Sequence, residues 1–228
     1  HQYQVLGISS AGFGSPTVLD RTAFARVKDL NVKRLSSLDK ESNRLVTKKW
    51  LEWLSQYKSE RPFFSYLHYD PPMNAIDSID FNLIPKQFLT KETDEHLKEV
   101  GRYTQSILFV DSEIDTILES LNRGGLLQET VIIITSDHGY ELNDYDTGYY
   151  GHASNYSRAQ LKTPLFMLWP NREPKEFTQR TSHNDIVPTL LTEVLGCSNP
   201  ASDYSSGFNL FSGESWEYLV TGSYDSYA

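Results

Sequence analysis

Short apolar runs alternate with segments of helical periodicity along the chain, and this alternation constrains the fold more than any other feature. The apolar runs are rich in β-branched and aromatic residues and lie at Tyr3–Ser9, Pro62–Tyr69, Val131–Thr135 and Pro164–Trp169. Apolar residues recur at helical spacing in Asn43–Tyr57, in Thr93–Asn122 and in a shorter segment from Asn184 to Gly196. Strands that alternate with helices predict an α/β fold with a mostly parallel sheet and helices on both faces.

The segment Thr93–Asn122 has the strongest helical pattern. Its apolar residues are expected on one face of the helix, and they are Leu97, Val100, Ile107, Val110, Ile114, Ile117, Leu118 and Leu121. Gly124 and Gly125 predict the end of this helix, because glycine adopts the left-handed conformation that closes many helices. The stretch 76–91 has weak periodicity, and we expect it to run over the surface.

The composition is that of a globular chain of 228 residues, long enough for one sizeable domain. Its formal net charge of -9 argues against nucleic-acid binding and against electrostatic docking on an anionic membrane. The single cysteine, Cys197, excludes an internal disulfide and a cysteine-based metal cluster. No apolar run approaches the roughly 18–20 residues of a membrane span. The chain begins at His1, without methionine, and we expect a fragment of a longer protein.

The run Val131–Thr135 ends abruptly in Ser-Asp-His-Gly, and two interpretations are open. In the first, the chain simply leaves the sheet through a polar turn. In the second, Asp137 and His138 bind a metal ion, because carboxylate oxygens and imidazole nitrogens are ligands of divalent ions. Both side chains reach one ion only where the chain turns, and Gly139 permits a turn. The motif follows a strand, and ligands of open α/β sheets bind beyond the carboxyl ends of strands.

A further histidine, His152, lies in a loop that is rich in Tyr, Asn and Asp. The loop runs from Tyr140 to Thr163 between two strand-like runs, and functional residues concentrate in such loops. Taken alone, His152 fits a solvated loop histidine as well as a functional residue. The residues themselves leave both interpretations open.

The motifs ETVIIITSDHG, GH, TPLFMLWP and HNDIVPTLL, in this order, resemble the C-terminal half of the sulfatase-like branch of the alkaline phosphatase superfamily. That branch includes sulfatases, phosphoethanolamine transferases and lipoteichoic acid synthases. The stretches HQYQVLGISSAGFGSP, WLEWLSQY and NPASDYSSGFNLF resemble the periplasmic domain of inner-membrane, sulfatase-like proteins. The resemblance covers His1 to about Phe211. It implies that residues 1–228 are the C-terminal part of a single sulfatase-like periplasmic domain, with membrane spans outside this fragment.

The resemblance also implies roles for individual residues. Asp137 and His138 match the metal-binding pair of the family, which implies a divalent ion such as zinc, manganese, magnesium or calcium. His152 matches a catalytic histidine that contacts phosphoryl or sulfuryl oxygens of the substrate. Asp185 matches a mainly structural position at the start of a helix, where an acid suits an N-cap.

Two departures from the family pattern bear on activity. The nucleophile of the family, and a further metal-binding acid, precede the segment at which this chain begins. Met73 stands where catalytic members have a histidine, and His68 lies on a strand-like run, where we expect a packed or half-buried side chain. We therefore expect weak or absent metal binding and no turnover by this fragment alone.

The resemblance leaves the function between two main alternatives. In one, the domain is related to metal-dependent hydrolases and phosphotransferases that act on a phosphate or sulfate ester. In the other, it is a non-catalytic regulator or sensor of envelope lipids, such as lipopolysaccharide and cardiolipin, with membrane proteins as partners. A third interpretation is a relict site without a ligand. Fold likeness by itself does not decide among them.

Overall fold

The computed structural model describes residues 3–14, 18–27, 30–34, 42–58, 60–70 and 95–222. The chain divides into two compact units, His1–Thr130 and Val131–Ala228. The surface course expected for 76–91, and the position of Met73, lie outside the described residues. Within the described residues, no helix combines the length and the apolar character that crossing a membrane requires.

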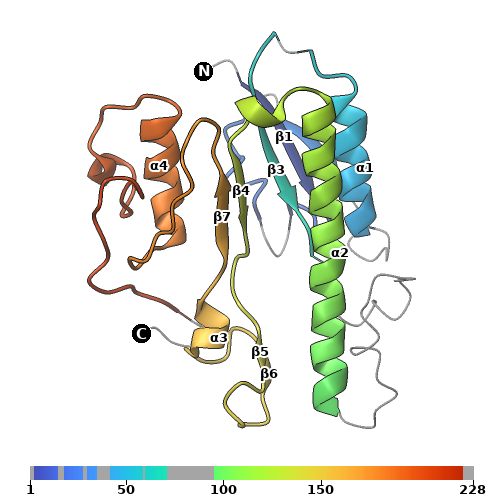
Figure 1. Ribbon diagram of the computed structural model, residues 1–228, viewed down its shortest axis with the longest axis vertical. Coiled ribbons are helices and arrows are strands. Elements are labelled where there is room, and N and C mark those ends of the chain that lie inside the picture. The colour runs from blue at the N-terminus through green and yellow to red at the C-terminus, as the bar shows by residue number, and fades with distance from the viewer. Residues whose placement is uncertain are drawn as a thin grey trace. The chain divides into compact units, whose positions relative to one another are not determined.

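A parallel sheet of three strands forms the centre of the first unit (Figure 1). Strand β1 (Gln4–Ser9) lies in the middle, between β2 (Leu30–Arg34) and β3 (Phe63–His68), and pairs in parallel with both. Leu6 and Ile8 of β1 are fully buried, as expected for a central strand. The sequence predicted β1 and β3 correctly. It missed β2, because the sequence LNVKR has no run of apolar residues.

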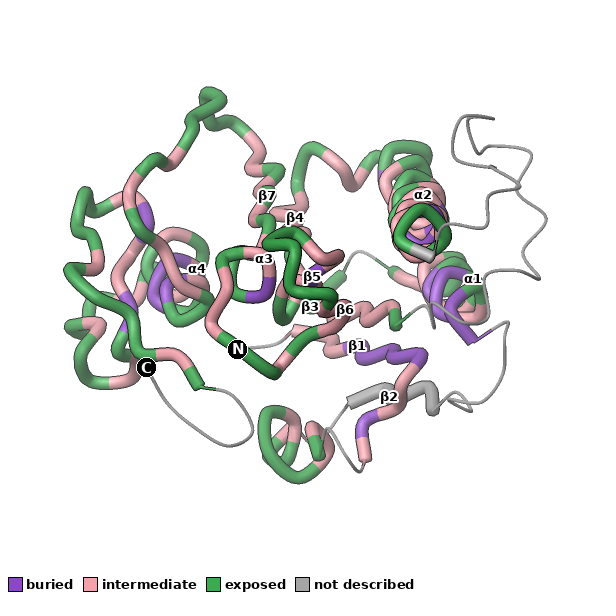
Figure 2. The backbone as a smooth tube through the Cα atoms, turned by 90° about the horizontal axis from the view of Figure 1, so that it is seen from below, coloured by how far each residue is buried: buried purple, intermediate pink, exposed green. Residues whose placement is uncertain are grey.

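Two helices pack side by side in this unit, α1 (Ser42–Leu54) and α2 (Glu95–Arg123) (Figures 1 and 2). Trp50 of α1 is 2% exposed and meets the ring of Phe63 in β3 edge to face, with ring centroids 5.8 Å apart. Its indole nitrogen donates to Ser120 Oγ of α2 at 2.9 Å. Trp50 therefore joins the sheet to both helices, and the two predicted helices are confirmed.

The other face of β3 is covered by a turn segment instead of a helix. Tyr66 points to this face, because alternate residues of a strand point to opposite sides. Its ring centroid lies 5.7 Å from that of Phe24 and 6.3 Å from that of Phe13. Among the described residues of this unit, the helix cover thus lies on one face of the sheet.

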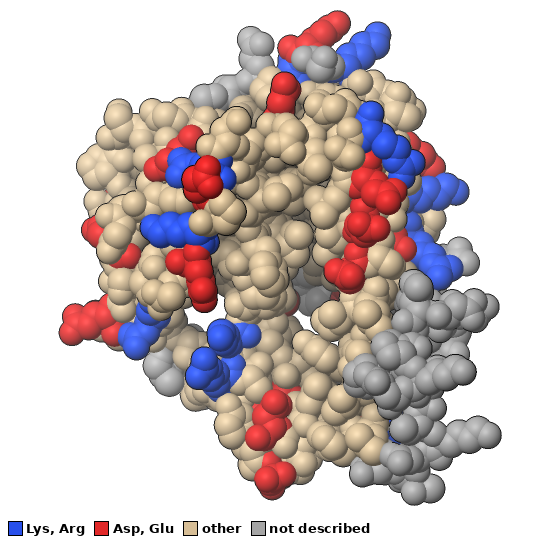
Figure 3. All heavy atoms as spheres, viewed as in Figure 1, with Lys and Arg blue, Asp and Glu red and all other residues tan. Residues whose placement is uncertain are grey.

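The buried face of α2 differs in part from the predicted one. Ile117 and Leu121 are buried as expected, but Ile107 is 52% exposed and Phe109 is buried in its place. The apolar residues of α2 cover more of its circumference than one neighbouring helix can bury, so the pattern alone did not fix the orientation. Acidic side chains gather along α2 on the face seen in Figure 3. Gly125, with φ +69°, ends the helix as predicted.

The second unit contains two short antiparallel ladders. Strand β4 (Ile132–Thr135) pairs with β7 (Leu165–Leu168), and β5 (Glu141–Leu142) pairs with β6 (Tyr150–Gly151). The expectation that the predicted strands all join one largely parallel sheet is therefore wrong for the β4–β7 pair. A parallel pair needs a crossover of a dozen or more residues that returns the chain to its starting edge. The chain between Thr135 and Leu165 makes no such crossover, and it returns beside β4 in the opposite direction.

Helix α4 (Ile186–Glu193) begins directly after Asp185, as the sequence predicts, but the Asp185 side chain makes no capping hydrogen bond to α4 and closes a capping box with Ser182 instead. Asp185 is 2% exposed, and its Oδ2 accepts a hydrogen bond from the backbone of Ser182 at 2.7 Å. The indole nitrogen of Trp216 donates to both carboxylate oxygens, at 2.9 and 3.0 Å. Gly196 follows the helix with φ +64°. Asp185 thus links the start of α4 to the later part of the chain.

The position of Trp50 leads to a prediction about stability. Trp50→Ala removes a buried indole and leaves a cavity, and should lower the free energy of unfolding by about 3–5 kcal/mol. Leu51→Ala, at a neighbouring position that is 38% exposed, should cost less than about 1 kcal/mol. Urea denaturation followed by circular dichroism, with hydrogen exchange of the β1 amides, measures both. Equal effects of the two changes would contradict this packing.

Candidate metal and oxyanion site

Hydrogen bonds from side chains to backbone carbonyls fix the chain at the end of β4. Thr135 Oγ1 donates to the carbonyl of Pro164 at 2.7 Å, next to the start of β7. His183 lies with its Nε2 2.8 Å from the carbonyl oxygen of Ser136. Because a carbonyl oxygen only accepts, Nε2 of His183 carries the hydrogen of this bond. The residue directly before Asp137 is therefore fixed by a side chain that is distant in sequence.

On the other side of the motif, Gly139 is required by space. Its amide donates to the carbonyl of Gln160 at 2.8 Å, and an added Cβ would lie 2.0 Å from the carbonyl oxygen of Ala159. Gly139 is not among the glycines with positive φ. The sequence thus indicated the correct residue for a different reason, because close approach of two backbones requires glycine here, and a special dihedral does not.

Asp137 and His138 form a compact pair at the end of β4. Asp137 Oδ1 accepts the backbone N–H of His138 at 2.9 Å, and Asp137 Oδ2 lies 3.5 Å from His138 Nε2. His138 Nδ1 lies 2.9 Å from the carbonyl oxygen of Gly139, so Nδ1 carries the hydrogen of that bond. In the neutral ring, Nε2 then presents a lone pair toward the carboxylate.

This donor pair fits shared binding of a cation. Two ligand atoms at roughly 2.0–2.1 Å from one tetrahedral ion lie about 3.3 Å apart. The separation of 3.5 Å between Asp137 Oδ2 and His138 Nε2 is close to that value. Among the described residues, however, no group of three or more His, Cys, Asp or Glu side chains is placed to hold a metal ion. The pair would therefore supply two ligands, where catalytic zinc sites take three from the protein.

His152 lies against His138. Their rings are stacked, with centroids 4.3 Å apart and planes 16° from parallel. Asp137 and His138 have side chains that are 79% and 45% exposed, and His152 is exposed as well. The structure thus brings the three sequence-predicted site residues together at the surface of the second unit. The stacked ring adds an imidazole beside the pair, where it can meet an oxygen of a bound anion.

The backbone around His152 has unusual conformations. Gly151 before it has φ +148°, and Ala153 after it has φ +57°. A non-glycine residue with positive φ costs of order 1 kcal/mol or more, and persists where surrounding contacts determine it. Tyr149 contributes one such contact, because its hydroxyl donates to the carbonyl of His152 at 3.2 Å.

A buried acid, Glu141, lies under this loop. It is 1% exposed, and its Oε2 accepts hydrogen bonds from Ser157 Oγ at 2.7 Å, Gln160 Nε2 at 2.9 Å and Asn155 Nδ2 at 3.1 Å. The hydrogen bonds from Ser157, Gln160 and Asn155 hold the pKa of Glu141 below its ordinary value, although burial acts in the opposite direction. The carboxylate form is therefore the stable one at neutral pH.

Sequence reasoning missed three residues that shape the site, namely Glu141, Gln160 and His183. Glu141 and Gln160 lie in polar stretches where no periodicity marks a buried position, and His183 is an exposed residue. His183 stands two residues before Asp185 in the motif HNDIVPTLL, and only the acid was singled out. A contact between residues 47 positions apart, such as that of Ser136 with His183, has no local signal.

The first unit has its own polar cluster at the carboxyl ends of its strands. Ser9 Oγ lies 2.8 Å from His68 Nδ1, in the register that pairs β1 with β3. His68 is partly buried, as the sequence predicts. Ser9 is fully buried, so its hydroxyl is not accessible as a nucleophile. This contact orients the imidazole ring of His68.

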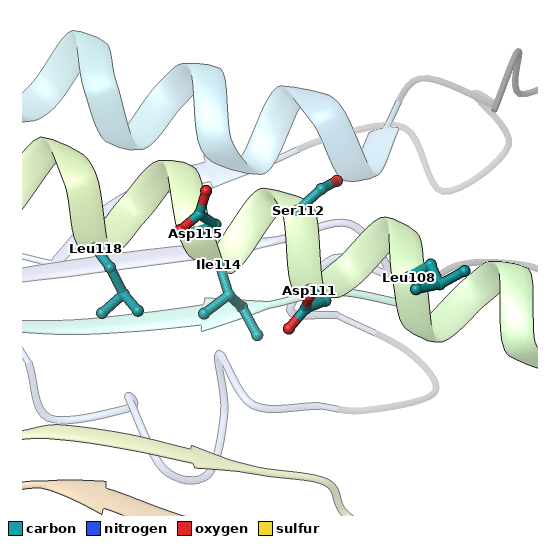
Figure 4. A pocket seen from close by; sticks show the side chains of 6 residues that line it. All are labelled: Leu108, Asp111, Ser112, Ile114, Asp115 and Leu118. Atoms are coloured by element: carbon teal, nitrogen blue, oxygen red, sulfur yellow. The ribbon is translucent and has the colours of Figure 1, made fainter. Parts of the chain in front are cut away.

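A shallow hollow runs along one face of α2 (Figure 4). It is lined by Leu108, Asp111, Ser112, Ile114, Asp115 and Leu118. None of the three sequence-predicted site residues lines it. Its walls combine apolar side chains with two exposed carboxylates, and all of them come from a single helix.

Two solved structures share the fold. The crystal structure of the lipoteichoic acid synthase LtaP from Listeria monocytogenes matches with a TM-score of 0.59 and 16% identity, over 83% of this chain and 49% of that one. The structure of Ps i-CgsB in complex with k-i-k-neocarrahexaose matches with a TM-score of 0.56 and 16% identity, over 92% of this chain and 54% of that one. The fold is therefore that of the α/β proteins related to alkaline phosphatases and sulfatases.

The family follows from the sequence comparison. The sulfatase family model matches residues 3–196, a range that contains Asp137, His138 and His152. The chain belongs to the sulfatase family. It is 29% identical over 210 residues to the inner membrane protein YejM of Salmonella typhimurium strain LT2, which is 92% of this chain and 31% of that protein. It is 30% identical over 139 residues to the uncharacterized sulfatase YdeN of Escherichia coli K12, which is 58% of this chain and 23% of that protein. The chain thus spans less than a third of the length of these relatives.

Gly139 gives a test of the local geometry. Gly139→Ala should lower stability by about 1–3 kcal/mol or more, because the new methyl group has no space beside Ala159. Gly14→Ala is a matched control, since a Cβ at Gly14 would meet nothing within 4 Å. Hydrogen exchange at the amide of residue 139 and thermal unfolding measure the effect. Unchanged protection of that amide in Gly139→Ala would show that the two backbones do not approach as described.

Proposed function

We propose that this chain is part of a periplasmic, sulfatase-like domain of an inner-membrane protein that acts on a phosphate or sulfate ester. The sulfatase match over residues 3–196 and the likeness to a protein named as an inner membrane protein support this assignment. The observation that carries it is the grouping of Asp137, His138 and His152, in which two donor atoms lie 3.5 Å apart and a second imidazole is stacked beside them.

In this proposal, Asp137 Oδ2 and His138 Nε2 hold a divalent cation of the zinc, manganese, magnesium or calcium kind. Such a cation neutralises charge on the oxygens of a transferring group. The hydrogen bond from His138 Nδ1 to Gly139 fixes the ring so that Nε2 remains available as a ligand. His152, as an exposed imidazole, donates a hydrogen bond to an oxygen of the ester or a proton to the leaving group.

A second candidate function is a receptor that binds an envelope lipid headgroup, such as that of lipopolysaccharide or cardiolipin, without turnover. The observation that favours it is Met73, which stands at the position where catalytic members of the family have a histidine. The same anionic group would be bound by the same side chains in both cases, and membrane proteins would be the partners of a receptor. Turnover by the whole protein separates the two functions.

Cation binding gives the first test of the site. In the whole protein, Asp137→Asn and His138→Ala should each weaken manganese or cobalt binding by at least roughly tenfold, because loss of even an outer-shell partner costs about 10–100-fold. His152→Ala should leave the affinity within about threefold, because its ring lies beside the donor pair. Calorimetry, and the absorption spectrum of bound cobalt, measure these affinities.

Asp146→Asn is the matched control for this experiment. Asp146 lies in the same loop, is exposed and has φ +55°, a conformation that asparagine tolerates well. The substitution Asp146→Asn removes one negative charge and leaves Asp137 and His138 unchanged. If Asp146→Asn weakens cation binding as much as Asp137→Asn does, general charge is responsible and the assigned ligands are wrong.

Activity of the whole protein gives the second test. With 4-nitrophenyl phosphate and 4-nitrophenyl sulfate as probes, Asp137→Ala and His152→Ala should each lower kcat/KM by roughly 10²–10³-fold, the usual cost of losing charge stabilisation in the transition state. Asp146→Asn should have no effect. Absence of turnover in the unchanged protein, together with loss of envelope control in a folded Asp137→Ala variant, would establish the non-catalytic receptor instead.

A further inference from the structure

Glu141 occupies a position that the proposed function does not use. It is a carboxylate at 1% exposure whose three donors are neutral side chains. Burying a charged group is costly unless hydrogen bonds compensate for the lost water. Neutral apolar or amide side chains would fill the same space at lower cost in free energy. The buried charge is therefore explained by the segments of chain that its three hydrogen-bond donors hold in place.

Glu141 contacts the chain on both sides of His152, by strand pairing before it and by side-chain hydrogen bonds after it. Glu141 itself belongs to β5, which pairs with β6, and β6 ends at Gly151, directly before His152. The three donors follow His152, in the segment 155–160. A single carboxylate therefore ties the residues before His152, through the β5–β6 pairing, to the residues after it.

Gln160 extends this network toward His138. Its side-chain nitrogen donates to Glu141, its side-chain oxygen accepts the amide of Ser154 at 3.2 Å, and its carbonyl accepts the amide of Gly139 at 2.8 Å. Gly139 is the residue next to His138. Gln160 thus restrains the chain next to both stacked rings. It holds Gly139, which follows His138, and Ser154, which lies two residues after His152.

The backbone beside His152 needs such restraint. Gly151 adopts φ +148° without strain, but Ala153 has φ +57°, which the local preference of a residue with a side chain does not maintain. The pair of strands β5 and β6 has two residues in each strand, too few for a hairpin that is stable by itself. Charge-assisted hydrogen bonds are roughly twice as strong as neutral ones, so a carboxylate restrains the loop better than an amide.

We infer that Glu141 is a positioning residue that keeps the His152 ring stacked on His138 by anchoring the segment 154–160. The positioning of the His152 ring is inferred from these hydrogen bonds alone. The effect of that positioning on an anion or ester rests on the proposed function. Asp137 and His138 have a second restraint in His183, which contacts Ser136, so the cation ligands depend less on Glu141 than His152 does.

Selective labelling of the histidine rings tests this inference. The chain has six histidines, so ring signals of His138 and His152 can be assigned by single substitution. A nuclear Overhauser effect between these two rings should be present in the unchanged protein. It should be weakened in Glu141→Gln, which keeps shape but loses charge, and lost in Glu141→Ala. Ser157→Ala, which removes the shortest of the three hydrogen bonds, should also weaken it.

Hydrogen exchange separates positioning from unfolding. In Glu141→Gln the amides of Gly139 and Ser154 should lose protection by at least about tenfold, while amides of β4 should keep theirs. Glu214→Gln is the control, since Glu214 is exposed in the same unit and loses the same charge. Its ring contact and amide protection should match those of the unchanged protein.

Two results distinguish this inference from the proposed function. Glu141→Gln should leave manganese affinity within about threefold while kcat/KM falls, because the ligands stay and His152 moves. If the unchanged protein binds no cation but the ring contact still depends on Glu141, the proposed function fails and the inference stands. A ring contact and amide protection that are unaltered in both Glu141→Gln and Ser157→Ala would overturn the inference, whatever the metal binding.

Discussion

The close approach of Gly139 to residues 159–160 is the contact on which the arrangement of the second unit depends. The amide of Gly139 donates to Gln160, and a side chain at 139 would overlap the backbone of Ala159. The chain after β4 must therefore fold back on itself within the loop. This return brings Pro164 beside Thr135, and β7 starts there in the direction opposite to β4. The contact of Gly139 thus holds the loop between β4 and β7 closed beside the candidate site.

The same contact explains how exposed side chains can have a defined geometry. Asp137 and His138 project into solvent, yet the backbone is fixed before them by His183 and after them by Gln160. A site that is built on a fixed backbone loses little conformational entropy when a ligand binds. The network around Glu141 extends this restraint to His152, which otherwise lies on a loop with unfavourable dihedrals.

The sequence predicted the elements whose signal is local. The runs of β-branched residues located β1, β3, β4 and β7, and the periodic apolar residues located α1 and α2. It missed β2, whose residues are paired by the neighbouring strand rather than marked by composition. It predicted Ile107 in the core where the structure has Phe109, because a helix with apolar residues on several sides does not reveal which side its partner will cover.

The candidate site shows the same division. Asp137, His138 and His152 were recognised because their residue types and their order are informative, and the structure brings them together. Glu141 and Gln160 were missed because burial of a polar side chain depends on contacts that form only after the loop closes. Gly139 was recognised, but as a flexible turn residue. The distance of an added Cβ from Ala159 could be known only once the loop was in place.

The exposure of the donor pair has a consequence for how ligands would bind under the proposed function. Two protein donors in contact with water hold a divalent cation weakly, and magnesium sites of this kind are commonly completed by oxygens of the substrate. A bound phosphate or sulfate ester would supply those oxygens, and His152 would contact another of them. Cation and ester would then each strengthen the binding of the other by the same factor, as linkage requires. Under the proposed function, His152 lies beside the donor pair but outside its coordination, so it would affect the affinity for the anion more than the affinity for the cation.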